Sequence, residues 1–163
     1  MSKISPCLWF NGHAEEAAEF YTSILPDSRV DKIHRAAADN PSTPQGGVLT
    51  VDFTLGGQSF IGLNGGPEFK FTEAISLSID CEDQAEVDRY WEALVEGGGE
   101  HSVCGWLKDR FGVSWQVIPR QLPEMLDSPD RAGAARAMQA MLEMTKIDVA
   151  KLREAFAGVP VQA

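Results

Sequence analysis

The chain has 163 residues, 44% of them hydrophobic and 23% charged, with 24 acidic against 14 basic side chains. The formal net charge of −10 repels nucleic-acid phosphates and anionic lipid headgroups, so neither nucleic acid nor a membrane is an expected partner. The three cysteines, Cys7, Cys81 and Cys104, form no CxxC pair, which argues against a disulfide framework or a structural zinc site. The apolar run near the N-terminus is too short for a signal peptide or a membrane span, and we expect a cytoplasmic protein.

The first half of the chain predicts a strand, a helix and three further strands. Residues 5–10 form a short apolar strand, and residues 11–25 follow as a helix whose small and apolar side chains recur at helical spacing. Residues 28–38 alternate as a strand. Residues 48–64 predict a hairpin that turns at Gly56-Gly57, a favoured two-residue turn.

The second half predicts the same order again. Residues 73–81 alternate apolar and polar side chains, as expected of a strand with one buried face. Residues 82–99 predict a helix with Asp83 as its N-cap, and the triple glycine ends it. Short strands follow over 100–119, with a tight turn at Gly112.

The two predicted helices are themselves similar at an offset of 70 residues. In this alignment the aromatic pair Phe20-Tyr21 falls on Tyr90-Trp91. A long period that recurs once indicates a duplicated supersecondary unit rather than a solenoid. We therefore expect a paired domain over residues 1–120, with modules at about 1–66 and 72–120.

Residues 121–163 differ in composition and predict a helical extension. Ser128 is the expected cap of the first helix, with Pro129 at its first position. A second helix is expected from about Asp148 to Phe156, ended by Gly158 and Pro160. The methionines of this extension favour adaptable core or subunit packing over a ligand surface.

Several stretches resemble one known superfamily. The stretch "AAEFYTSILP" resembles the first-helix pattern of the vicinal oxygen chelate superfamily, and "KDRFGVSWQVI" resembles its final hairpin, with Asp109 and Gly112 in register. The superfamily includes glyoxalase I, bleomycin-resistance proteins and extradiol dioxygenases. "YWEALVEGG", "GWLKDRFGVSWQVIP" and the tail "AMQAMLEMTKID" are similar to its PhnB-like branch, labelled 3-demethylubiquinone-9 3-methyltransferase.

The resemblance implies an α+β fold. Two βαβββ modules would form a cupped, mixed eight-stranded sheet, with C-terminal helices added in this chain. Helices would cover the outer faces, the concave interior would hold a small-molecule ligand, and a homodimer is the usual assembly.

The positions where metal-dependent relatives place their ligands carry neutral residues here. The resemblance puts Gln116 at the last-strand glutamate, Ser76 near a histidine, and Asn64 on the fourth strand, while the first strand has no histidine. Amide oxygens bring no charge to offset the dehydration of a cation. We therefore predict a cleft without a metal, and no cofactor.

The methyltransferase label receives no support from the residues. The common fold for S-adenosylmethionine chemistry needs a parallel sheet and a glycine-rich turn that opens a helix. None of the three glycine clusters, at 56–57, 65–66 and 97–99, is expected to open a helix.

A cleft without a metal must hold its ligand by apolar burial and a few polar anchors. Phe53 and Phe60 face each other across the predicted hairpin, on a face that meets either the helix or the ligand, whereas Trp115 is expected in the core. The predicted ligand-binding residues are aromatic or neutral polar groups of the strands: Trp9, Phe53, Asn64, Ser76, Trp106 and Gln116.

Two functions remain open from the sequence. The first is a binding protein of the glyoxalase/bleomycin-resistance type for a small aromatic or planar molecule. The second is a metal-dependent or non-standard vicinal oxygen chelate enzyme, of lyase, isomerase or dioxygenase type, with His34, Cys7 or Asp52 as its acid–base group. Measurement of bound metal distinguishes them.

Overall fold

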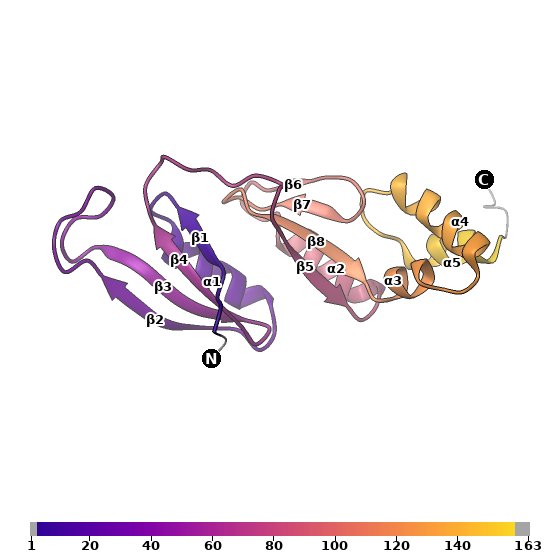
Figure 1. Cartoon of the computed structure of the whole chain (residues 1–163), viewed down its shortest axis with the longest axis horizontal. Coiled ribbons are helices and arrows are strands. Elements are labelled where there is room, and N and C mark those ends of the chain that lie inside the picture. The colour runs from indigo at the N-terminus through magenta and orange to yellow at the C-terminus, as the bar shows by residue number, and fades with distance from the viewer. Residues whose placement is uncertain (1–2, 159–163) are drawn as a thin grey trace. The chain divides into compact units, whose positions relative to one another are not determined.

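The computed structural model describes residues 3–158, and it divides the chain into two compact units, Met1–Phe71 and Thr72–Ala163. Each unit contains one four-stranded mixed sheet with a helix on one of its faces (Figure 1). The predicted α+β class with two modules is therefore confirmed, with its eight strands in two sheets of four. Within the described residues, no helix is both long and apolar enough to cross a bilayer.

The first unit follows the predicted order of elements. Its strands lie in the order β1-β4-β3-β2, with β1 parallel to β4 and the other pairs antiparallel. The elements are β1 (Cys7–Phe10), α1 (Ala14–Ile24), β2 (Arg29–Arg35), β3 (Val48–Leu55) and β4 (Gln58–Asn64).

Helix α1 packs closely against its sheet because the contacting residues are small. Ala14, Ala17, Ala18 and Tyr21 form its buried face. A Cβ atom at Gly62 of β4 would lie 3.2 Å from the Cβ of Ala14, which is closer than ordinary van der Waals contact. Gly62 therefore lets the helix approach the sheet, and it identifies the face of β4 that meets the helix.

The second unit repeats this topology. Its strands lie in the order β5-β8-β7-β6, with β5 parallel to β8. Helix α2 begins at Gln84 and α1 at Ala14, which is the predicted offset of 70. Trp91 is buried in α2 as Tyr21 is in α1. The elements are β5 (Ser76–Cys81), α2 (Gln84–Ala93), β6 (Glu100–His101), β7 (Trp106–Lys108) and β8 (Ser114–Pro119).

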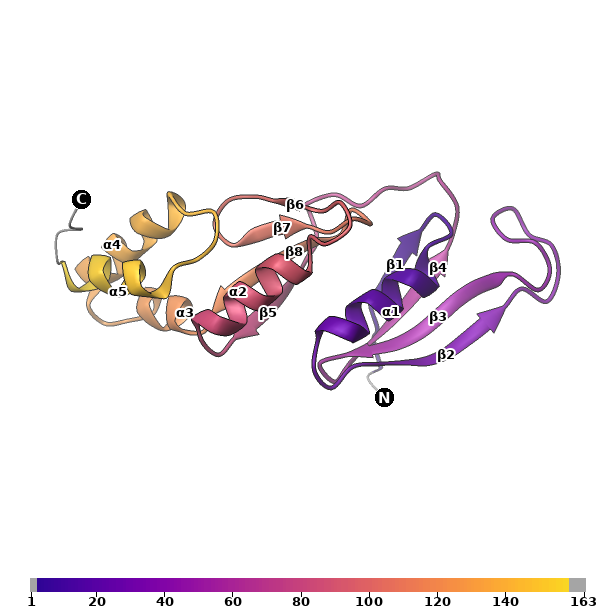
Figure 2. The same ribbon diagram turned by 180° about the vertical axis from the view of Figure 1, so that it is seen from behind.

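Three helices follow β8, namely α3 (Gln121–Leu126), α4 (Arg131–Leu142) and α5 (Val149–Ala157). They belong to the second unit (Figure 2). Their core is a cluster of Leu122, Ile147 and Leu152, against which Met141 and Met144 pack. These two methionines are thus partly buried and pack against the core, one of the two roles, core or subunit contact, that the sequence predicted.

The residues that cap the helices of the second unit were predicted in part. The Asp83 carboxylate accepts a hydrogen bond from Glu86 N at 2.9 Å, which confirms it as the N-cap of α2. Helix α5 begins after Asp148 and ends at Gly158, whose φ of 75° suits glycine. Pro160 lies outside the described residues.

The predicted cap of α4 was wrong. The N-cap is Asp130, whose carboxylate accepts from Gly133 N at 2.9 Å. Ser128 instead accepts a hydrogen bond from Asp130 N in the turn before the helix. Both residues are good caps, but only the carboxylate reaches a free amide of the first turn, so Pro129 precedes the helix rather than beginning it.

Candidate functional site

In the second unit, α2 covers one face of the sheet (Figure 2), and no helix of the described residues covers the opposite, open face (Figure 1). Along β8, Trp115 and Val117 are fully buried, whereas Gln116 between them is only partly buried. Successive side chains of a strand point to opposite faces, so Gln116 lies on the open face and Trp115 is a core residue, as predicted. By the same alternation, Trp106 and Lys108 of β7 lie on the open face, on either side of buried Leu107.

Three predicted ligand-binding residues meet on this open face. Trp106 pairs with Gln116 across the β7–β8 ladder. The Gln116 side chain donates a hydrogen bond from Nε2 to Ser76 Oγ at 2.9 Å. Gln116, which the sequence resemblance matched to a ligand glutamate, is thus an amide that donates to a hydroxyl, and this pair is uncharged.

A pocket of about 520 Å³ opens beside these residues. Trp106, Lys108 and Ser114 contribute to its wall, together with Glu73 and the β6–β7 turn. Lys108 forms an ion pair with Glu73. The hydrogen bond between the Lys108 and Glu73 side chains lowers the pKa of Glu73 and raises the pKa of Lys108. Both groups are therefore charged and paired at neutral pH.

Ser114 is the most unusual polar group of this pocket. It is only 2% exposed, and its Oγ has no hydrogen-bond partner in the part of the chain that the structure describes. An unmade hydrogen bond at a buried hydroxyl costs about 1–3 kcal/mol. A ligand atom that donates to or accepts from Ser114 Oγ would recover this free energy, because Ser114 lines the pocket.

The open face of the first sheet has a different character. Trp9 lies on it, donates from Nε1 to Gly66 O at 2.9 Å, and contacts the Phe69 ring edge-on at 4.9 Å. A second depression of about 440 Å³ is lined by charged side chains that include Arg29 and Asp31, which form an ion pair at 2.7 Å. Trp9 is therefore already engaged within its own unit.

The candidate acid–base groups lie in this first unit. His34 Nε2 contacts Asp52 Oδ2 at 2.9 Å, in a hydrogen bond between neighbouring strands. Cys7 lies on β1 at the other edge of the same sheet, and partial burial raises the pKa of its thiol. His34 and Asp52 therefore occur together, while β4 lies between Cys7 and Asp52, and both β4 and β3 lie between Cys7 and His34.

Two predicted ligand-binding residues face the helix rather than open space. Phe53 is 1% exposed, contacts the Tyr21 ring and stacks on Phe60 at 5.5 Å, so it belongs to the core under α1. Asn64 is also buried and serves α1, because its Oδ1 accepts from Ala14 N at 2.9 Å. Both side chains therefore support the fold, and we do not include them in the candidate site.

Sequence reasoning missed Glu73, Lys108 and Ser114. Lys108 and Ser114 are a cross-strand pair, two residues from Trp106 and Gln116 respectively. The two-residue period of a strand places them on the same face as these predicted residues, so the signal was present. Within residues 3–158, no three His, Cys, Asp or Glu side chains are grouped closely enough to hold a metal ion.

Comparison with known proteins identifies the family. The family model of 3-demethylubiquinone-9 3-methyltransferase matches residues 2–118. A search of the curated proteins found no match. The match ends before α3, so the predicted resemblance of the tail to the same branch stays a prediction.

One solved structure of the same description supports this assignment, and two further solved structures are similar to the chain at lower identity. A putative 3-demethylubiquinone-9 3-methyltransferase, PhnB protein, from Bacillus cereus is 36% identical with a TM-score of 0.63, over 71% of this chain and 97% of that one. Protein PA1353 from Pseudomonas aeruginosa is 23% identical with a TM-score of 0.52, over 71% and 95%. A glyoxalase/bleomycin resistance protein from Albidiferax ferrireducens is 17% identical with a TM-score of 0.44, over 70% and 96%. The chain belongs to the 3-demethylubiquinone-9 3-methyltransferase family, the PhnB-like group that the sequence resemblance predicted.

Proposed function

We propose that the pocket on the open face of the second sheet binds a small planar or aromatic molecule, and that the chain acts as a binding protein. The observation that carries this proposal is the buried hydroxyl of Ser114, which lines the pocket without a hydrogen-bond partner among the described residues. The pocket volume of about 520 Å³ lies within the usual range for small-molecule sites.

The remaining wall supports the same conclusion. Trp106 supplies an aromatic surface on which a planar molecule can stack, and aromatic pairs gain about 0.5–1.5 kcal/mol beyond their buried area. Gln116 and Ser76 are not among the residues that line the pocket, but they supply neutral polar atoms on the same face of the sheet. A ligand held in this way needs no metal, because stacking and hydrogen bonds provide the affinity.

The test uses the tryptophan indole N–H signals in ¹⁵N–¹H correlation spectra. The wild-type chain is titrated with four planar probes: indole, quinoline, benzimidazole and 2-naphthol. We expect 2-naphthol or quinoline to shift the Trp106 signal, assigned with Trp106→Phe, and to leave the signals of buried Trp91 and Trp115 in place.

A matched pair of variants tests the location. A probe that binds the folded protein raises its Tm. Trp106→Ala should abolish this increase in Tm, whereas Trp9→Ala, a substitution on the other sheet, should preserve it. If no probe moves the Trp106 signal up to its solubility limit, or if Trp9→Ala has the larger effect, the proposed site is wrong.

We also propose a cytoplasmic homodimer, as the family resemblance implies. Met138 and Leu142 lie one turn apart on α4 and are 47% and 60% exposed, which leaves an apolar strip for a subunit contact. Sedimentation equilibrium of the wild type and of Leu142→Glu measures the assembly. A monomeric wild type would refute this part of the proposal.

A further inference from the structure

Residues 144–149 run from the connection after α4 into the first residue of α5, and we call them the strap. The strap binds the β6–β7 turn through its backbone, because Cys104 N donates to Met144 O and Gly105 N donates to Thr145 O, both at 2.8 Å. Cys104 has a φ of 57°, in the left-handed region that residues other than glycine rarely adopt. Such a conformation persists only where its surroundings fix it. The strap supplies this constraint.

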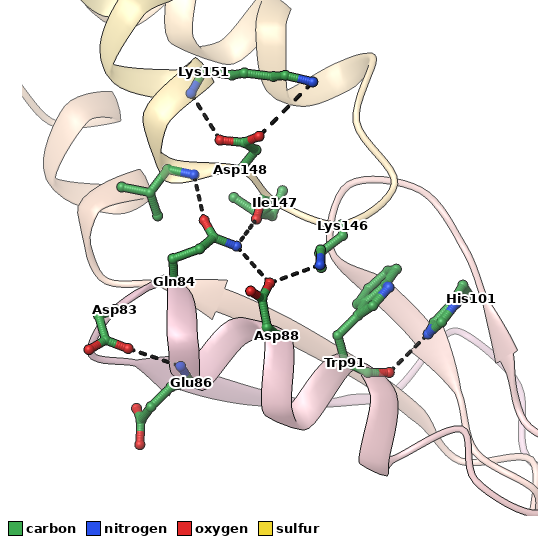
Figure 3. Close-up of polar contacts among 11 residues, drawn as sticks. Asp83, Gln84, Glu86, Asp88, Trp91, His101, Lys146, Ile147, Asp148 and Lys151 are labelled. Carbon is green, nitrogen blue, oxygen red and sulfur yellow. Dashed lines mark hydrogen bonds and ion pairs between the residues drawn. The ribbon is translucent and has the colours of Figure 1, made fainter.

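One side chain of α2 holds the strap from the other side (Figure 3). Gln84 Oε1 accepts from Val149 N at 2.8 Å, and Gln84 Nε2 donates to Ile147 O at 3.1 Å and to Asp88 at 3.0 Å. Asp88 in turn pairs with Lys146 of the strap at 2.8 Å. The Gln84 side-chain amide thus binds the strap backbone as a neighbouring strand would. It accepts from one backbone N–H of the strap and donates to one backbone carbonyl.

The turn that the strap supports is also a wall of the candidate pocket. Val103 and Cys104 line the pocket. On the opposite side, a Cβ atom at Gly105 would lie only 3.0 Å from Ile147 Cγ1, so the strap packs directly against the turn. Ile147 is fully buried in the core of the C-terminal helices. The wall therefore has the ligand pocket in front of it and the strap behind it.

We propose that the strap is the support of the pocket wall, that Gln84 is its positioning residue, and that the C-terminal helices are therefore part of the small-molecule site. This inference rests on the proposed function. The strap lies beyond residues 2–118, so the part of the chain that the family model matches supplies the sheet, and the extension supplies the support.

The three cysteines allow a test that needs no ligand. Native protein is labelled with N-ethylmaleimide, and the rate at each cysteine is measured by peptide mass spectrometry. Cys104 reports the turn, exposed Cys7 in the first unit is the internal reference, and buried Cys81 reports global unfolding. Burial raises the pKa of Cys81 to about 12, so it reacts slowly while the second unit stays folded.

The variants are Gln84→Ala and Lys146→Met, and the control is Gln139→Ala at an exposed position of α4. Loss of hydrogen bonds to the strap should raise the labelling rate of Cys104 relative to Cys7 about tenfold for Gln84→Ala. Lys146→Met should give a smaller increase of about two- to threefold, because an exposed ion pair contributes less. Gln139→Ala should give none, and Cys81 should stay protected in all three.

The same variants are then titrated with 2-naphthol at the Trp106 indole signal. We expect Gln84→Ala to weaken binding about fivefold and Gln139→Ala to leave it unchanged. Unchanged Cys104 labelling in Gln84→Ala overturns the role of the strap, whether or not a probe binds. Faster labelling with unchanged affinity overturns its role in the site while the proposed function stands. If no probe binds even the wild type, the proposed function fails, and the site role of the strap fails with it.

Discussion

The substitution Ser114→Ala should stabilise the protein and weaken its ligand binding at the same time. Ser114 Oγ is buried and has no hydrogen-bond partner among the residues that the structure describes, so the folded state bears the cost of its desolvation. That cost is about 1–3 kcal/mol. The missing oxygen atom leaves a small space beside the pocket, and this space costs up to about 1 kcal/mol.

The net expectation is an increase of about 1 kcal/mol in the free energy of unfolding, which corresponds to about 2–4 °C in Tm for a chain of this size. Urea unfolding followed by tryptophan fluorescence measures the first quantity, and calorimetry measures the second. Ser78→Ala is the matched control, because Ser78 is an exposed serine on β5, the strand that pairs with β8. Its effect should stay within about 0.5 kcal/mol.

Binding should change in the opposite direction. Loss of one hydrogen bond to the ligand weakens the affinity for 2-naphthol about fivefold. If Ser114→Ala destabilises the protein by about 1 kcal/mol or more, the hydroxyl has a partner in the folded state, and our reasoning about the pocket is wrong. An unchanged affinity would show that the hydroxyl does not contact the probe.

Three further predictions concern the fold and the metal question. Asp109 accepts hydrogen bonds from Val113 N at 3.0 Å and Trp115 Nε1 at 2.9 Å in a buried turn, so Asp109→Ala should lower the free energy of unfolding by about 3 kcal/mol in urea titrations. Gly62→Ala should cost about 1–3 kcal/mol in the same assay, because its Cβ would press on α1. Gln116→Glu should leave the protein without stoichiometric Mn, Fe, Ni or Zn by elemental analysis after dialysis, because its neighbour Ser76 adds no charged ligand. Stoichiometric metal in that variant would contradict a neutral site.

The sequence predicted which residues share a strand face more reliably than which face meets the helix. Phe53 and Phe60 do face each other, but they lie under α1. The two-residue period of a strand shows which side chains share a face, but it does not show which of the two faces packs against the helix. Gly62 and Asn64 lie on the same face as Phe60, and a glycine in mid-strand indicates close approach of another element. This signal would have assigned the face.

Hydrogen bonds between distant residues were beyond prediction from spacing. Asn64 caps α1 across 50 residues, and Gln84 binds Val149 across 65. Nothing in the local pattern around Asn64 or Gln84 indicates these partners, because both depend on how the elements pack. The short helix α3 was missed for a related reason, since six residues are too few for a periodic pattern.

The parallel strand pairs affect the order in which the chain can fold during synthesis. In each unit the first strand is held by the last one, with Cys7 opposite Ile61 and Ser76 opposite Ser114. Neither sheet can be completed until the ribosome has made its final strand. The N-terminal sheet can therefore form while the C-terminal sheet is still being translated, because domains fold as units from the N-terminus. Residues 144–149 are synthesised after both sheets, so the pocket wall would reach its final form only after the strands of the C-terminal sheet have been made.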